Sequence, residues 1–290
     1  MKKYLSLFLI VLMFCAVISI GCGGGGSDST DSEQTESLTD DTGGEDTTYD
    51  PNEEGRGGRG AVIDLSAMTE DYTAEDGEIL SMSPGAAFKI SIADGATVTL
   101  RNVTINGVDS KSCKWAGLNC AGDATIILEG TNSVRGFHYK YPGIYVPEGK
   151  TLTIKGNGAL TASSNGYAPG IGGGNYIPCG NIVIESGTIT ATGGSYAAGI
   201  GAGSSRNCGN ITITGGTVTA TGGFGSAGIG GGYYSNCSSI TITDKVTKVT
   251  AKKGEEAPYS IGAGRGRTCE TVTIGGKAGQ ISDSPYTYQP

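Results

Sequence analysis

The chain has 290 residues, of which 52 are glycine and only one, His138, is histidine. Residues 22–55 hold eleven acidic residues and no basic one, whereas residues 56–290 hold 17 acidic and 18 basic residues, so the body is nearly neutral. A neutral body lacks the basic surface that nucleic-acid binding requires. The single histidine argues against most histidine-based catalysis and most zinc sites. We therefore expect no nucleic-acid partner. We also expect no cofactor, no metal and no catalytic residue.

The first segment is typical of an exported protein. Two lysines at positions 2 and 3 precede an apolar run over residues 4–20, which is the layout of a secretory signal peptide. The four residues from Ser19 to Cys22 read SIGC and resemble the lipobox of bacterial lipoproteins, with Ser19 in place of the usual leucine. The resemblance implies a signal peptide at residues 1–21 and a lipid on Cys22 that anchors the protein to a membrane, on the cell surface. An uncleaved apolar anchor is the alternative.

Residues 22–60 consist mostly of Gly, Ser, Thr, Asp and Glu, with hardly any large apolar side chain. Such a composition cannot offset the entropy of ordering the chain. The sequence therefore predicts an acidic, flexible tether between the anchor and the rest of the protein.

The chain beyond residue 60 repeats itself. The motif GIGGG at residue 170 recurs, with small changes, at residues 199, 228 and 260. Four cysteines recur with the same spacing as this motif: Cys179, Cys208, Cys237 and Cys269. Between them lie short alternating segments such as NITI at residue 210 and TVTAT at residue 217, so each repeat predicts three short strands. The earliest clear copy is TVTL at residue 97.

Alternation assigns the two faces of these strands. Apolar residues such as Ile211, Ile213 and Val218 share one face, and threonines share the other. One repeat buries too little to fold alone, so the repeats must stack. We predict an all-β fold, a right-handed single-stranded parallel β-helix with about 29 residues per rung, over residues 61–283. Residues 284–290 are then a tail. A propeller is the second choice, although its blades need more residues.

Alignment of the copies also predicts a column of charges on the outer surface. It places four residues of alternating sign on successive rungs: Arg101, Glu129, Lys155 and Glu185. Opposite charges are favourable between neighbouring strands, so this column supports the predicted register.

Six cysteines lie beyond the anchor, and an exported protein can oxidise them. Rungs about 4.8 Å apart fall inside the Cα separation that a disulfide allows. The simplest pairing joins Cys179 to Cys208 and Cys237 to Cys269, which leaves Cys113 with Cys120. A column of reduced, apolar cysteines is the alternative.

The glycine motifs predict a bare outer strip at Gly172, Gly201, Gly230 and Gly262, with aromatic residues on both sides. Tyr167, Tyr196 and Phe224 precede the strip, and Tyr176, Tyr233 and Tyr234 follow it. A glycine floor with aromatic walls suits the flat faces of sugars. Four further aromatic residues could extend this surface: Trp115, Tyr139, Tyr141 and Tyr145. Alternatively, the rings only cover loop backbone.

Catalytic chemistry has little support in the repeats. Residues 170–243 contain two charged residues, Glu185 and Arg206, and so lack the carboxylate pair of a glycosidase. Three upstream aspartates, Asp94, Asp109 and Asp123, could hold calcium, but aspartates in turns after strands are more often structural. An active site would have to lie within residues 61–145.

Residues 61–276 resemble the repeat-rich surface proteins of bacteria that carry carbohydrate-binding β-helix domains. The phrases TLTIKGNGALTAS, AGIGAG, CGNITITGGTVTATGG and AGIGGG carry this resemblance. It implies a cell-surface polysaccharide binder, in some relatives with bound calcium. We expect a membrane-anchored, non-catalytic, carbohydrate-binding surface protein. The alternatives are a structural or adhesive protein that binds another protein, and a polysaccharide-degrading enzyme.

Overall fold

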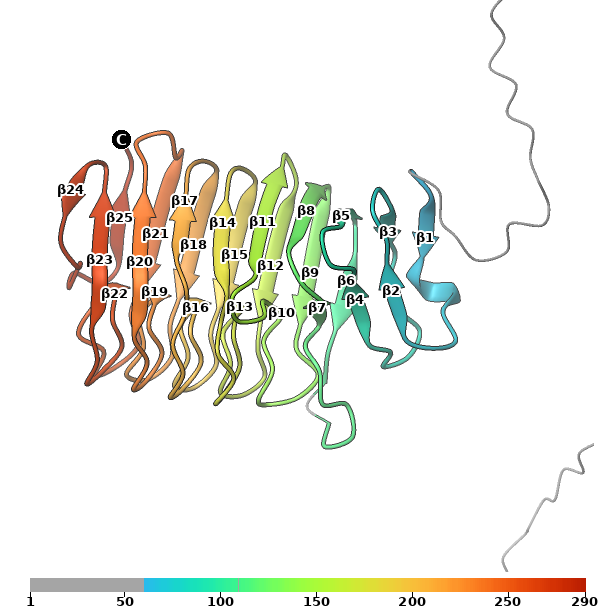
Figure 1. Ribbon diagram of the computed structural model, residues 1–290, viewed down its shortest axis with the longest axis horizontal. Coiled ribbons are helices and arrows are strands. Elements are labelled where there is room, and N and C mark those ends of the chain that lie inside the picture. The colour runs from blue at the N-terminus through green and yellow to red at the C-terminus, as the bar shows by residue number, and fades with distance from the viewer. Residues whose placement is uncertain (1–59, 109) are drawn as a thin grey trace, which may run out of the picture. The chain divides into compact units, whose positions relative to one another are not determined.

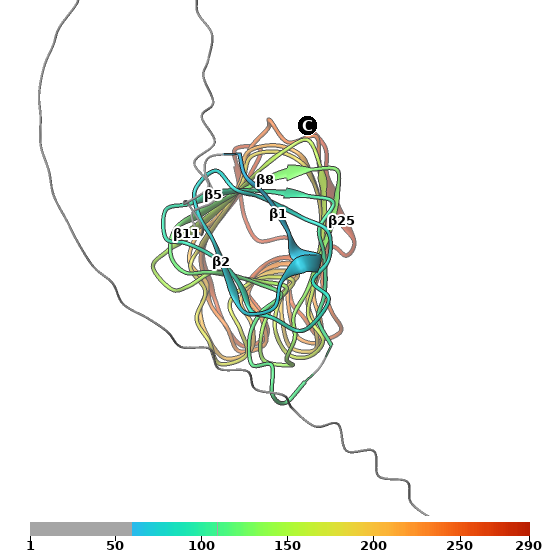
Figure 2. The ribbon, with the colours of Figure 1, turned by 90° about the vertical axis from the view of Figure 1, so that its right-hand side faces the viewer.

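The computed structural model describes residues 60–108 and 110–290, which form an all-β parallel solenoid (Figure 1). Strands from successive turns lie side by side along the long axis, and each complete turn contributes one strand to each of three sheets. The only helix among the described residues is a short 3-10 turn, η1, at Leu65–Ala67. Viewed along the axis, the chain encloses a central core (Figure 2).

The three sheets have the following strands. Sheet A contains β1 (Val62–Asp64), β3 (Ile79–Ser81), β5 (Thr97–Arg101), β8 (Ala124–Glu129), β11 (Thr151–Gly156), β14 (Asn181–Ile184), β17 (Ile211–Ile213), β20 (Cys237–Ile242), β23 (Cys269–Ile274) and β24 (Lys277–Ala278). Sheet B contains β2 (Tyr72–Ala74), β4 (Ile90–Ile92), β7 (Leu118–Cys120), β10 (Ile144–Tyr145), β13 (Ile171–Gly172), β16 (Ile200–Gly201), β19 (Ile229–Gly230) and β22 (Ile261–Gly262). Sheet C contains β6 (Thr104–Asn106), β9 (Thr131–Arg135), β12 (Ala159–Ser163), β15 (Thr188–Thr192), β18 (Thr217–Thr221), β21 (Lys248–Lys252) and β25 (Tyr286–Tyr288).

The predicted inner face is confirmed. Ile171 pairs in register with Ile200, which pairs with Ile229, which pairs with Ile261. All four side chains are fully buried and form one column of the core, while the threonines at alternate positions of sheet C face outward. Stacking therefore gives each isoleucine the apolar neighbours that a single turn lacks.

The solenoid begins upstream of the earliest clear repeat, because its first turns are short. Val62 pairs with Ile79, and Ile79 pairs with Thr99, so each of these turns takes fewer residues than the turn from Ile171 to Ile200. The next turn, in which Thr97 pairs with Thr125, already has nearly the main spacing. In the first two turns the side of sheet C is formed by η1 and by the irregular segment 82–89. Comparison of the chain with itself at the main period therefore detects no copy before Thr97, although the stacking starts at Val62.

The predicted charge column is correct only in part. Arg101 pairs with Glu129 in register, but Lys155 lies beside Ile127 rather than Glu129. Eight positions separate Ile144 from Leu152 in one turn, whereas six separate their partners in the turn before. The two extra residues shift β11 by two positions along β8. Because side chains alternate with a period of two, the same residues still face inward and outward. Alternation in the sequence cannot detect such a shift.

The last residues close the C-terminal end of the solenoid. β24 pairs antiparallel with β23, Ile281 forms an antiparallel bridge with Ile261, and β25 pairs antiparallel with β21. Each sheet thus ends in a returning segment that runs against its last parallel strand. The boundary at residue 283 was therefore wrong, because Tyr286–Tyr288 forms part of sheet C rather than a tail. The reason is that unpaired strand edges are unfavourable at the end of a sheet.

Candidate functional site

Two rows of loops flank sheet B and lie along the lower edge of the solenoid in Figure 1. We call them together the loop face. The first row leads from sheet C to sheet B and comprises residues 136–143, 164–170, 193–199, 222–228 and 253–260. The second row leads from sheet B to sheet A and comprises residues 173–180, 202–210, 231–236 and 263–268. The sheet B strands between the two rows have only two residues each, so the positions of the loops depend largely on contacts between loops.

Backbone hydrogen bonds join the two rows. Within one turn, Ala198 N–H donates to the carbonyl of Ala202 over 3.0 Å, which brings the start and end of the strand together. Between turns, Tyr233 N–H donates to the carbonyl of Tyr196 over 3.0 Å, and Arg265 N–H donates to that of Gly225 over 2.8 Å. The loop face is therefore a continuous structure rather than a set of independent loops.

The predicted bare glycine strip is wrong. The four strip glycines are buried, and each has a φ between +124° and +141°: Gly172, Gly201, Gly230 and Gly262. A Cβ on Gly201 would clash with the carbonyl oxygen of Gly230 in the next turn. Glycine is required there because the backbones approach closely in a left-handed conformation. An added Cβ on Gly201 would also meet the core side chain of Ile211. The strip is therefore buried and offers no floor to a ligand.

The aromatic residues of the first row form a continuous series of ring contacts. Ring centroids lie 5.9 Å apart from Tyr139 to Tyr167, 5.7 Å from Tyr167 to Tyr196 and 5.6 Å from Tyr196 to Phe224. Tyr233 of the second row joins this series at 5.2 Å from Tyr196. We call these rings, with Tyr234, the aromatic row: Tyr139, Tyr167, Tyr196, Phe224, Tyr233 and Tyr234.

The aromatic row is partly open to solvent. Tyr167 and Tyr196 expose 38% and 37% of their surface, and Tyr234 exposes 45%. The rings of Tyr233 and Tyr234 are 4.2 Å apart, and the hydrogen bond between their side chains raises the pKa of Tyr233. Five of the six predicted binding residues therefore meet. Tyr176, the sixth, is 60% exposed on the second row and makes no ring contact with the aromatic row among the described residues.

Tyr139, one of the four residues predicted to extend the aromatic surface, adds one turn to the aromatic row. Its carbonyl accepts a hydrogen bond of 2.7 Å from Tyr167 N–H, so the two residues occupy equivalent places in neighbouring loops. The other proposed extensions lie elsewhere. Trp115 packs on Phe137 at 6.0 Å, Tyr141 packs against His138 at 5.9 Å, and half-buried Tyr145 pairs with Gly172 on sheet B.

An open cleft of about 530 Å³ lies on the aromatic row between Tyr139 and Tyr167. Asn165, Gly166, Gly194 and Ser195 complete its lining. The Asn165 amide nitrogen donates to the carbonyls of Gly136 and Gly107, at 2.7 and 3.0 Å. Its Oδ1 atom is buried and has no hydrogen-bond partner among the described residues. Sequence reasoning missed Asn165, because nothing in its repeat position distinguishes it from a turn residue.

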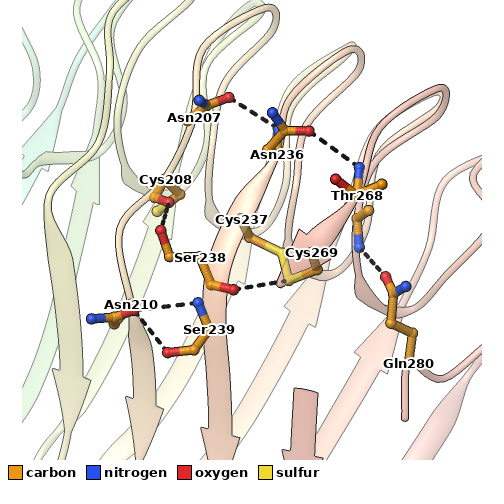
Figure 3. Close-up of a disulfide and its surroundings, with 11 residues drawn as sticks. Asn207, Cys208, Asn210, Asn236, Cys237, Ser238, Ser239, Thr268, Cys269 and Gln280 are labelled. Carbon is orange, nitrogen blue, oxygen red and sulfur yellow. Dashed lines mark hydrogen bonds between the residues drawn. A yellow bond between two sulfur atoms is a disulfide. The ribbon is translucent and has the colours of Figure 1, made fainter. Parts of the chain in front are cut away.

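The cysteine column is partly oxidised. Cys237 and Cys269 form a disulfide with Cα atoms 4.6 Å apart, beside a hydrogen-bonded series of Asn207, Asn236 and Thr268 (Figure 3). The other predicted bonds are absent among the described residues. Cys179 and Cys208 are free thiols whose sulfurs lie 2.7 Å apart, and burial raises the pKa of Cys208.

Cys113 and Cys120 also remain free. They do not share a column, because Cys120 is buried on β7 whereas Cys113 lies half-buried in the preceding loop. Burial raises the pKa of Cys120 to about 12, which keeps this thiol protonated at neutral pH.

The upstream aspartates make hydrogen bonds within the fold. Asp94 accepts from Asp123 N–H at 2.7 Å and from the Lys150 ammonium at 3.1 Å. The hydrogen bond from Lys150 lowers the pKa of Asp94, and that from Asp123 N–H adds to the effect. Asp123 in turn accepts from Thr151 N–H at 2.7 Å, while Asp109 lies outside the described residues. Among the residues that the structure describes, no three His, Cys, Asp or Glu side chains gather to hold a metal ion.

His138 lies in the loop 136–143, where it packs between aromatic rings. Its ring centroid is 4.3 Å from that of Tyr139, and its Nδ1 accepts a hydrogen bond of 3.3 Å from Lys140 N–H. It is 6% exposed.

The predicted signal peptide, Cys22 and the predicted tether up to residue 59 precede the described residues. In the described part of the chain, no helix has the length and apolarity needed to span a membrane.

Comparison with known proteins agrees with this architecture. A family described as Beta helix repeat matches residues 182–204 and 211–233, which are consecutive copies of one turn. No curated protein and no solved structure matches the chain. The family match and the solenoid together support a β-helix repeat fold.

Proposed function

We propose that this protein is a non-catalytic binder that holds polysaccharide along its aromatic row. The observation that carries the proposal is the continuity of the row, in which neighbouring ring centroids lie 5.9, 5.7 and 5.2 Å apart from Tyr139 through Tyr196 to Tyr233. Partly exposed rings give apolar area on which the C–H faces of sugars pack. A row that crosses several turns suits an extended polymer better than a small molecule.

Polar groups beside the rings would fix the orientation of a sugar. The cleft between Tyr139 and Tyr167 is lined by Asn165 and Ser195, whose side chains are of the types that exchange hydrogen bonds with sugar hydroxyls. Apolar walls with a few polar groups are the usual composition of a ligand site.

The sequence before the solenoid supports a location for this binder. We propose that the protein is an exported bacterial lipoprotein whose lipid on Cys22 holds it to a membrane, so that polysaccharide is bound outside the cell. Incorporation of a labelled fatty acid tests this, because Cys22→Ala would abolish labelling. A labelled Cys22→Ala variant would contradict the anchor without affecting the sugar site.

Retention on a panel of insoluble glycans tests the binding function. We expect Tyr167→Ala with Tyr196→Ala to lower retention at least tenfold, because two stacking surfaces are lost, each worth about 1 kcal/mol. The matched control is Thr190→Ala with Thr219→Ala, two exposed positions on sheet C. Far-ultraviolet circular dichroism checks that both variants remain folded.

Three results would count against the proposal. Retention of the wild-type chain on no glycan would remove the binding function and favour a structural or adhesive protein. Equal loss in the threonine control would place the site on sheet C. Release of soluble sugar from any glycan would show that the protein is an enzyme.

A further inference from the structure

The second row of loops carries a repeated backbone conformation. Three positions before each column cysteine, the backbone has a positive φ in four successive turns: 61° at Tyr176, 61° at Ser205, 54° at Tyr234 and 73° at Gly266. Positive φ is uncommon for residues other than glycine, and tyrosine has no local side-chain hydrogen bond to favour it. Tyrosine at two of these positions therefore requires contacts that hold it there.

An arginine from the following turn supplies that contact in both cases. Arg206 Nε donates to the carbonyl of Tyr176 over 3.2 Å, and Arg267 Nε donates to the carbonyl of Tyr234 over 3.2 Å. Arg267 also lies 5.9 Å from the centre of the Tyr234 ring. Both arginines are exposed. Aromatic and cationic side chains therefore alternate along the loop tips, in the order Tyr176, Arg206, Tyr234 and Arg267.

The hydrogen bonds to the tyrosine carbonyls use only the Nε atoms of Arg206 and Arg267, which leaves their terminal nitrogens for a ligand. Among the described residues, Arg206 and Arg267 make no ion pair, whereas Arg265 pairs with Glu256. Glu185, the only other charged residue between 170 and 243, follows β14 at the far end of a sheet A strand. Arg206 thus presents unpaired positive charge on an otherwise uncharged part of the loop face, and Arg267 presents a second unpaired charge two turns further on.

We propose that the Tyr176–Arg206–Tyr234–Arg267 series makes this protein a receptor for acidic polysaccharide, with polymer carboxylates bound by the two arginines. A guanidinium presents parallel N–H donors that match the two oxygens of a carboxylate. Tyr176 and Tyr234 supply ring faces for the sugars between the charges. This inference rests on the proposed polysaccharide binding and adds the charge of the ligand.

Affinity electrophoresis with matched polymers tests the inference. Carboxymethyl cellulose is compared with hydroxyethyl cellulose, and polygalacturonate with its neutral methyl ester, so that each pair differs mainly in carboxylate. We expect retardation at least tenfold stronger by the acidic member, decreasing as salt screens the charges. Cellulose sulfate, as a further arm, distinguishes a carboxylate site from a general anion site. Stronger retardation by the sulfate would overturn the choice of carboxylate.

Variants assign the effect to the arginines. Arg206→Ala with Arg267→Ala should lower affinity for the acidic polymers about tenfold, and affinity for the neutral polymers by a smaller factor, because the Arg267 contact with the Tyr234 carbonyl is lost as well. Arg206→Lys with Arg267→Lys keeps the charge but loses the paired N–H donors, and should therefore bind the acidic polymers more weakly than wild type and more strongly than the alanine double variant. Arg135→Ala with Lys155→Ala removes the same charge from sheets C and A, and should have no effect.

The possible results distinguish the preference for acidic polymers from polysaccharide binding itself. Equal retardation of wild type by acidic and neutral polymers would overturn the acidic preference and leave polysaccharide binding in place. Loss of acidic binding in the Arg135/Lys155 control would show that net charge, not the loop tips, is responsible. No retardation by any polymer, together with no retention on insoluble glycans, would overturn both proposals.

Discussion

The buried side of sheet B and the loop tips that follow its strands differ in how strictly the residue type repeats from turn to turn. On the inner side of sheet B, four successive turns carry the same residue, isoleucine, in register and fully buried. A few residues further along, the loop tips at the equivalent outer position carry Tyr176, Ser205, Tyr234 and Gly266. The backbone conformation is shared there, but the side chain is not. Stacking therefore constrains the inside of the solenoid and leaves the outside free to acquire binding residues.

The physical reason is the difference in contact between the two sides. A buried isoleucine touches its copies in the turns above and below, so a smaller side chain leaves a cavity that the neighbours cannot fill. An exposed tyrosine at a loop tip can be replaced without opening the core. Substitutions on the two sides should consequently differ by several kcal/mol in the free energy of unfolding.

The largest effect is expected for the isoleucine column. Ile200→Ala should lower the free energy of unfolding by about 2–5 kcal/mol, because the site is fully buried between two other turns. Urea unfolding followed by circular dichroism measures the change. Thr190→Ala, on the outer face of sheet C, is the control and should change stability by less than about 0.5 kcal/mol. Equal losses at the two positions would contradict the distinction between inside and outside.

The buried glycine strip gives the next effect. Gly201→Ala should cost about 1–3 kcal/mol, because alanine disfavours the φ of +130° and its Cβ would meet the Gly230 carbonyl. Gly149→Ala separates the two causes, since Gly149 has a φ of +74° but no heavy atom within 4 Å of the added Cβ. It should therefore be the milder substitution in thermal unfolding. A Gly201→Ala protein as stable as wild type would mean that the strip is open after all.

The sequence predicts the inner side of the fold much better than the loop face. Alternation and period locate the isoleucine column and the solenoid, because stacking repeats the same requirement in each turn. They do not detect the first turns, from Val62 to Thr97, because these turns are shorter than the main repeat. They also miss the returning strand at Tyr286–Tyr288, which pairs antiparallel with β21 and is not a copy of the parallel strands before it.

The candidate site shows the same limit. Residue type and loop position indicate five rings of the aromatic row, since aromatic residues recur next to the glycine motifs. The positive φ of the strip glycines does not follow from the sequence, so the strip is expected to be open when it is in fact buried. The contacts of Arg206 and Arg267 with tyrosine carbonyls depend on a neighbouring turn and on backbone conformation. Neither is encoded in a local pattern.

The smallest effect is expected for the outer charges of sheet A, where it tests the register itself. Arg101 and Glu129 form an ion pair of 2.6 Å, with side chains 42% and 40% exposed. A double-mutant cycle with Arg101→Ala and Glu129→Ala should give a coupling energy of about 0.2–1 kcal/mol that decreases with salt, because water screens exposed pairs. Lys155→Ala with Glu129→Ala should give a weaker coupling, since Lys155 lies beside Ile127. The reverse order of couplings would place β11 two residues away from its position in the structure, and the inner isoleucines would remain buried in either register.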